Sequence, residues 1–310
     1  MSIELSDLAA RVPRPDDDAR AAARARLAEL APVGAFGRLG ELAEWLAGVQ
    51  GQCPTWPLDR VRFIAKAAPA ASALLEASPA TARLVEGFQR IDSPGDVGEP
   101  PRDSLGGRAV GRDEIERAFD AGMAVATEEV EGRADLLVAT DIGVDSAVAG
   151  ATAVAVLTGA DVASIVGRGT GIDDREWMRR CAEVRDTARL ARRTLSGGAD
   201  ILDLLSTLGS FDLAALTGLL TQGSIQRTPV VLDGLGTAAA ALVAHRLSPR
   251  TARWLVAAHV SPDPGQAAAL DKLRLRPWLD YAISLDDGTG ALLMVPLLQA
   301  AVRLLAADEP

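Results

Sequence analysis

The chain has few of the residues that build metal, redox and aromatic sites. Its 310 residues include only two cysteines and two histidines. Cys53, Cys181, His245 and His259 lack the close spacing of a Cys/His metal site, so we predict no bound metal. No GxGxxG fingerprint follows a predicted strand, and we predict no cofactor. Aromatic residues make up only 4%, so the 48% of hydrophobic residues must form a core of Ala, Leu and Val.

Positive charge and long apolar runs are also scarce. The chain has 42 acidic and 32 basic residues, a net charge of −10 and a pI near 4.8. Nucleic acid and anionic membranes are bound by basic faces, so we predict neither as a partner. The most apolar stretches, residues 147–157 and 292–305, are shorter than the roughly 20 residues of a membrane span. The first residues lack the basic and apolar regions of a signal peptide, and we therefore predict a cytoplasmic protein.

Predicted strands and helices alternate along most of the chain. The predicted strands cover residues 60–65, 136–140, 229–232 and 254–258. The predicted helices beside them cover residues 112–131, 147–157, 175–195, 214–221, 237–246 and 266–273. Such alternation is typical of a parallel sheet with right-handed crossovers. We predict an α/β fold, with a Rossmann-like parallel sheet flanked by helices.

The two ends of the chain read as helices outside this repeat. The pattern predicts helices at residues 16–30 and 39–49, and a third at 291–305. We expect residues 1–59 and 291–310 to form a smaller helical domain beside an α/β domain of residues 60–290. Between them, residues 67–88 have a helical composition, and residues 92–111 form a loop rich in proline, glycine and charge.

The strongest candidate for a catalytic group is Asp287. It lies in a glycine turn between a short apolar run at 281–285, interpreted as a strand, and the last helix. This arrangement places a carboxylate and free backbone N–H groups at the carboxyl end of a strand, where open α/β sheets bind ligands. Asp287 is then a candidate general base. The alternative is that Asp286 and Asp287 only cap the helix.

A glycine-rich turn from Gly167 to Gly171 is a candidate phosphate cradle. Its glycines allow the backbone to approach an anion, and Thr170 can donate a hydrogen bond. Arg180, on the helix that follows, is placed to reach the same anion. The alternatives are an ordinary loop whose glycines need a positive φ, and a solvated surface arginine.

Polar residues follow two further predicted strands. Asp141 can orient a ligand, act as an acid or base, or cap the next helix. After the strand at 254–258 come His259, Ser261 and Asp263. No GxSxG elbow surrounds Ser261, so we exclude a serine hydrolase. We predict that His259 is a hydrogen-bonded wall residue.

Six segments in order carry a resemblance to a known family. They are the helices within residues 32–51, Asp141-Ile142-Gly143-Val144, Val166-Gly167-Arg168-Gly169-Thr170-Gly171, Pro229-Val230-Val231-Leu232-Asp233-Gly234, the stretch 259–265, and Asp287-Gly288-Thr289-Gly290-Ala291-Leu292. Together they resemble the nicotinate-nucleotide:dimethylbenzimidazole phosphoribosyltransferase family, which makes α-ribazole phosphate for the lower ligand of cobalamin.

The resemblance implies a reaction and a set of binding residues. Asp287 would take the proton from one benzimidazole nitrogen while the other attacks ribose C1 of nicotinate mononucleotide and nicotinate leaves. The implied substrate-binding residues are Asp141, Gly143, Gly167, Arg168, Gly169, Thr170, Arg180, Ser261, Gly288, Thr289 and Gly290. It also implies a homodimer, with a heteromer containing an active homologue as the alternative.

The chain departs from the family pattern at several of these positions. Asp287 stands where the family has Glu, which shortens the side chain by about 1.5 Å. Arg180 stands where a lysine is usual, and residues 145–148 replace Gly-Asn-Thr-Thr. After residues 63–65 the family's Asp-His-Gly turn is missing, and the chain is shorter there. These departures leave a second hypothesis open, a non-catalytic paralogue that binds a nucleotide or base, or serves as a partner subunit.

Overall fold

A five-stranded parallel sheet forms the centre of the computed structural model, which describes residues 5–64, 85–89, 110–140, 146–168, 172–285 and 287–306. The strand order is β2-β1-β3-β4-β5, and every neighbouring pair is parallel. The strands are β1 Val61–Ile64, β2 Val85–Gln89, β3 Leu136–Ala139, β4 Val230–Leu232 and β5 Leu255–Ala257. The predicted α/β class and four predicted strands are confirmed.

Alternate residues of the strands enter two separate hydrophobic clusters, as the two-residue period of a strand requires. One cluster contains Ile64, Leu137, Ala139, Val230, Leu232, Leu255 and Ala257. The other contains Val61, Phe63, Leu136, Val138, Val231 and Val256. Both faces of the sheet are therefore covered, and β3, β4 and β5 are apolar throughout.

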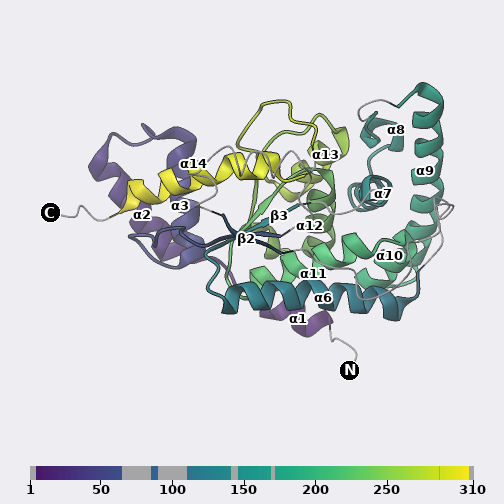
Figure 1. Cartoon of the computed structure of the whole chain (residues 1–310), viewed down its shortest axis with the longest axis horizontal. Helices are drawn as coiled ribbons and strands as arrows, with labels where there is room; N and C mark the ends of the chain where they lie inside the picture. Colours follow the sequence, from purple (N-terminus) through teal and green to yellow (C-terminus); the bar gives the residue numbers. More distant parts are fainter. Residues whose placement is uncertain are drawn as a thin grey trace.

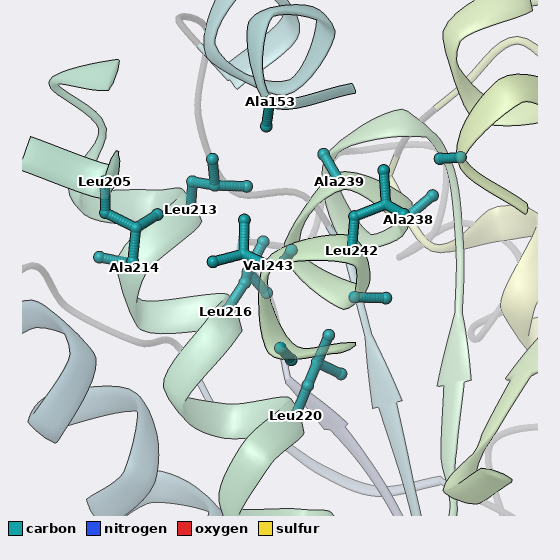
Figure 2. Packing of buried hydrophobic residues seen from close by; sticks show 14 of the residues in the cluster. Ala153, Leu205, Leu213, Ala214, Leu216, Leu220, Ala238, Ala239, Leu242 and Val243 are labelled. Carbon is teal, nitrogen blue, oxygen red and sulfur yellow. The ribbon is translucent and has the colours of Figure 1, made fainter. Parts of the chain in front are cut away.

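The larger layer of helices covers the first of these faces. It contains α6 Arg112–Glu131, α7 Ser146–Thr158, α8 Val162–Ile165, α9 Asp174–Ser196, α10 Ile201–Leu208, α11 Phe211–Ile225, α12 Leu235–Leu247 and α13 Pro264–Leu273. Figure 2 shows Ala153 of α7 and Val243 of α12 turned toward the same core as Leu216 of α11. This is the predicted core of Ala, Leu and Val.

Helices from both ends of the chain cover the other face. They are α2 Asp17–Leu30, α3 Gly37–Gln50 and α14 Thr289–Leu305, which lie together at one end of the molecule (Figure 1). Asp16 caps the start of α2, and its Oδ1 accepts a hydrogen bond from the N–H of Ala19 at 2.8 Å. The short helix α1 Leu5–Arg11 packs instead with the first face, through Leu8. The division into two domains stays a prediction.

Three secondary-structure predictions were wrong. Residues 85–88, predicted as the end of a helix, belong to β2, and residues 67–84 lie outside the described part of the chain. The run 281–285 is not a strand: Ala282 has a left-handed φ of 51°, and Tyr281 and Leu285 are exposed. Residues 251–254 form a 3-10 turn, so Trp254 precedes β5. Among the described residues, no helix combines the length and apolar character needed to cross a bilayer.

Candidate functional site

The carboxyl ends of β3, β4 and β5 bring three buried polar residues to one edge of the sheet. Thr140 follows β3, Asp233 follows β4, and His259 comes two residues after β5. Their exposed fractions are 0%, 1% and 0%. Ala139 pairs with Leu232, and Leu232 with Ala257, so the three strands end at the same level.

Asp233 fastens the start of α14 to this edge. Its Oδ2 accepts the N–H of Gly288 at 2.8 Å, and its Oδ1 accepts the N–H of Ala291 at 2.9 Å. Nε2 of His259 lies 3.2 Å from Oδ1 of the same carboxylate. The sequence placed Asp233 only at a strand end, because nothing local links it to a turn 55 residues later in the chain.

Two glycines allow the turn before α14 to lie against the sheet edge. Gly288 has φ +92°, and a Cβ there would lie 2.0 Å from Cζ of Phe63. A Cβ on Gly290 would lie 2.0 Å from Cδ2 of His259. Any larger residue at either position would push the turn away from the strand ends.

The carboxylate of Asp287 lies in this turn and is 8% exposed. Its Oδ1 accepts the N–H of Thr289 at 3.0 Å. Its Oδ2 is buried and has no hydrogen-bond partner among the described residues. The role as a helix cap therefore applies to Oδ1, which accepts a backbone N–H group. The predicted role as a general base can apply only to Oδ2. Asp286 lies outside the described residues.

Two hydroxyl groups at the same edge of the sheet are also buried without a hydrogen-bond partner among the described residues. Oγ1 of Thr140 and Oγ1 of Thr289 are buried, and neither has a partner within the described ranges. Buried polar groups in proteins are nearly always hydrogen-bonded. Three such oxygens near one turn have hydrogen-bonding capacity that a polar ligand or ordered water can use.

A separate group of predicted residues lines a cavity of about 480 Å³. Gly167, Arg168, Arg180 and Ser261 all lie on its wall, and Ser284, three residues before Asp287, lies there too. The volume lies within the range of about 300–1,000 Å³ that ligand sites occupy. The fold thus brings together four predicted binding residues from three segments. Asp141, Gly143, Gly169 and Thr170 lie outside the described residues.

Gln266 connects the cavity to the turn that carries Asp287. Its Oε1 accepts the N–H of Ser261 at 2.7 Å. Its Nε2 donates to the carbonyl oxygens of Asp233 at 3.2 Å and of His259 at 3.1 Å. Gln266 is 1% exposed. Gln266 was not predicted from the sequence, because a glutamine in a predicted helix carries no signal of such a role.

The two arginines on the cavity wall form ion pairs with neighbouring acidic residues. Arg168 pairs with Asp174 and lies 4.8 Å from the ring centre of Trp177. Nε of Arg180 lies 3.4 Å from Oε1 of Glu176. Hydrogen bonds from Arg179, with a further contribution from Arg180, lower the pKa of Glu176 to about 2. Each cavity arginine therefore has an acidic residue beside it.

Asp263 adds a carboxyl group to the cavity wall beside Gly167. Its Oδ1 accepts the N–H of Gly265 at 2.8 Å and so caps α13. A Cβ on Gly167 would lie 2.4 Å from Oδ2 of Asp263, which explains the glycine at that position. Burial raises the pKa of the Asp263 carboxyl, against the effect of the N–H groups of Gly265 and Gln266. This carboxyl is therefore protonated more easily than an exposed one.

Known proteins resemble the chain along nearly its whole length. A family model described as phosphoribosyltransferase matches residues 12–88 and 70–308. The nicotinate-nucleotide-dimethylbenzimidazole phosphoribosyltransferase of Mycobacterium avium (strain 104) is 41% identical over 96% of this chain and 94% of its own. The enzyme of that name from Streptomyces coelicolor is 38% identical over 100% of this chain and 96% of its own. The crystal structure of CobT from Thermus thermophilus matches with a TM-score of 0.78 and 29% identity, over 93% of this chain and 96% of that one.

Proposed function

The chain belongs to the nicotinate-nucleotide:dimethylbenzimidazole phosphoribosyltransferase family, and from this premise we propose how its own residues carry out the reaction. The enzyme transfers the ribose phosphate of nicotinate mononucleotide to dimethylbenzimidazole or a related base, a step of cobalamin biosynthesis. The relatives support this activity, and they do not support a non-catalytic binding protein.

Asp287 is the proposed general base. One nitrogen of the incoming base attacks ribose C1, the bond from C1 to nicotinate breaks, and Asp287 takes the proton from the other nitrogen. The observation that carries this assignment is its buried Oδ2, which has no partner among the described residues. A general base must reach its proton within about 2.6–3.2 Å, so an oxygen free of other bonds is required.

The 480 Å³ cavity is the proposed site of nicotinate mononucleotide. Arg180 and Arg168 supply positive charge for the phosphate, and Gly167 allows the backbone to approach it. Ser261 lies on another segment of the wall and contacts the ribose phosphate in this proposal. Thr140 and Thr289 lie near Asp287 with hydroxyl groups that suit the polar atoms of a substrate. The N–H group of Gly288 donates to the carboxylate of Asp233, and the N–H group of Thr289 donates to that of Asp287.

We further propose that the enzyme is a cytoplasmic homodimer. Leu30 and Val33, at the end of α2 and in the link to α3, are 44% and 89% exposed, and Leu293 on α14 is 41% exposed. Apolar side chains of this size on the layer formed by the chain ends suit a contact with a second copy.

The activity is tested with the purified wild-type protein. Nicotinate mononucleotide and dimethylbenzimidazole are mixed with it, and nicotinate and α-ribazole phosphate are quantified by chromatography. We expect equal amounts of both products, and no nicotinate when the base is omitted. Binding of the mononucleotide without either product would contradict the proposed function.

A further inference from the structure

Asp233 and His259 form a buried pair directly beneath the turn that carries Asp287, and neither is needed to contact the reacting atoms. We propose that Asp233, supported by His259, is a positioning residue that fixes the carboxylate of Asp287 in its working place. This inference rests on the proposed function, in which Asp287 is the base.

The hydrogen bonds of Asp233 determine where the turn lies. Its two oxygens accept the N–H groups of Gly288 and Ala291, at 2.8 and 2.9 Å. These donors stand on either side of Thr289, whose N–H in turn holds Oδ1 of Asp287 at 3.0 Å. One carboxylate on the sheet therefore fixes the backbone from which the base projects. A shift of about 1 Å in a catalytic group can reduce the rate about a hundredfold.

His259 restrains the same turn from a second direction. Its Nε2 lies 3.2 Å from Asp233, and the side chains of both residues are 0% exposed. A Cβ on Gly290 would come within 2.0 Å of its ring, so ring and turn are in tight contact. Gln266 also donates to the carbonyl oxygens of both residues. Asp233 and His259 are thus fixed at the ends of β4 and β5, and the turn before α14 is hydrogen-bonded to Asp233.

The test is the variant Asp233→Asn, which keeps the shape of the side chain and replaces one acceptor oxygen with a donor NH₂. We expect kcat to fall about ten- to a hundredfold. We expect KM for nicotinate mononucleotide to stay within about twofold, because an isosteric side chain leaves the cavity wall unchanged. Because a loss of folded protein would also lower the apparent kcat and leave KM unchanged, kcat is calculated per mole of enzyme that binds nicotinate mononucleotide in a calorimetric titration.

Asp200→Asn is the matched control. Asp200 also accepts two backbone N–H groups, those of Leu202 and Asp203, and its side chain also contacts a basic residue, Arg112. It stands at the start of α10 and does not line the cavity. We expect this variant to lower the thermal midpoint and to leave kcat unchanged.

A second variant covers the case in which Asp233→Asn does not fold. His259→Gln leaves both N–H bonds of Asp233 in place and removes the ring that touches Gly290. We expect it to lower kcat with little change in KM. The proposal is overturned if the folded variants keep kcat within twofold, if the loss lies in KM, or if Asp200→Asn loses as much kcat.

These results are distinguishable from a failure of the proposed function. An inactive wild type would remove the proposed function itself, and a fully active Asp287→Ala variant would remove the role of Asp287 as the base. An inactive Asp287→Ala variant beside a fully active Asp233→Asn variant would remove only the positioning role.

Discussion

At the level of single residues, the two oxygens of the Asp287 carboxylate have different surroundings. Oδ1 accepts a hydrogen bond from the backbone, whereas Oδ2 has no partner among the described residues. Leaving a buried acceptor unpaired costs about 1–3 kcal/mol. A proton donor from a substrate would remove this cost, as the proposed role of Asp287 in the place of the family's Glu requires.

Arg180 provides a prediction about substrate binding. The variant Arg180→Met keeps the apolar length of the side chain and removes its charge. Since a hydrogen bond to a charged group contributes about 1.5–3 kcal/mol, we expect KM for nicotinate mononucleotide to rise about ten- to a hundredfold. Steady-state kinetics measure this change, and kcat should be affected much less.

Arg189→Met on the same helix is the control for this prediction. Arg189 is 66% exposed and lies 3.7 Å from Asp186, and it does not line the cavity. We expect its KM to equal that of the wild type. Equal KM values for the Arg180→Met enzyme and the wild type would remove Arg180 from the phosphate site.

Residue roles were predictable from the sequence only where a local motif marks them. Gly167, Arg168, Arg180 and Ser261 were expected to bind substrate, and all four line one cavity, although their binding role is still a prediction. Asp233 and Gln266 carry no such motif. Their importance depends on contacts with residues far along the chain, and these appear only when the fold is known.

At the level of elements, a very close contact between two helices is made possible by glycine. A Cβ on Gly218 of α11 would lie 2.0 Å from the carbonyl oxygen of Phe119 on α6. A Cβ on Gly122 of α6 would lie 1.8 Å from the carbonyl oxygen of Ala215 on α11. Figure 1 shows the two helices running side by side below the sheet. Their backbones touch, so neither helix can accept a side chain at the crossing.

We predict that Gly218→Ala destabilises the protein. The new methyl group meets backbone and not a flexible side chain, so the helices must separate, at a cost of about 1–3 kcal/mol. The free energy of unfolding from urea titration measures the effect.

Gly150→Ala in α7 is the control for this substitution. Its Cβ would lie 3.5 Å from Cγ of Leu235, an ordinary contact. Because alanine is the better helix former by about 1 kcal/mol, we expect this variant to be as stable as the wild type or more stable. Equal stability of both variants would contradict the account of the α6 and α11 contact.

Secondary structure was predictable where the hydrophobic period is long and regular. Helices such as α6 and strands such as β3 lie where the sequence predicts them. The run 281–285 has the composition of a strand, yet the left-handed φ of Ala282 interrupts the extended backbone. Whether an apolar run of five residues pairs with a sheet is decided by tertiary context, which the sequence pattern does not contain.

At the level of the whole molecule, the sheet is covered on both faces, and helices from near both ends of the chain meet on one of them. The helices α2, α3 and α14 share a hydrophobic cluster with Phe63, Val138 and Val231 of the sheet. The alternation of strands and helices was sufficient to predict the α/β class. The helical pattern near both ends of the chain predicted that these helices pack together. Their shared hydrophobic cluster with the sheet became visible only in the three-dimensional structure.

The homodimer is a prediction at this scale. Multi-angle light scattering of the purified protein should give twice the chain mass of 32.2 kDa. The variant Val33→Asp places a charge on a side chain that is 89% exposed, and we expect it to shift the mass toward the monomer. A monomer mass for the wild type at micromolar concentration would contradict the dimer.

The central claim is that Asp287 is the base of a phosphoribosyl transfer, and one comparison tests it most directly. Wild type and Asp287→Ala are each titrated calorimetrically with nicotinate mononucleotide, and the rate of α-ribazole phosphate formation is then measured in the same samples. General bases contribute about 10²- to 10⁴-fold to rates. The account predicts equal affinity for the mononucleotide and a loss of rate of that size in the variant. An Asp287→Ala enzyme that forms product at the wild-type rate would contradict it.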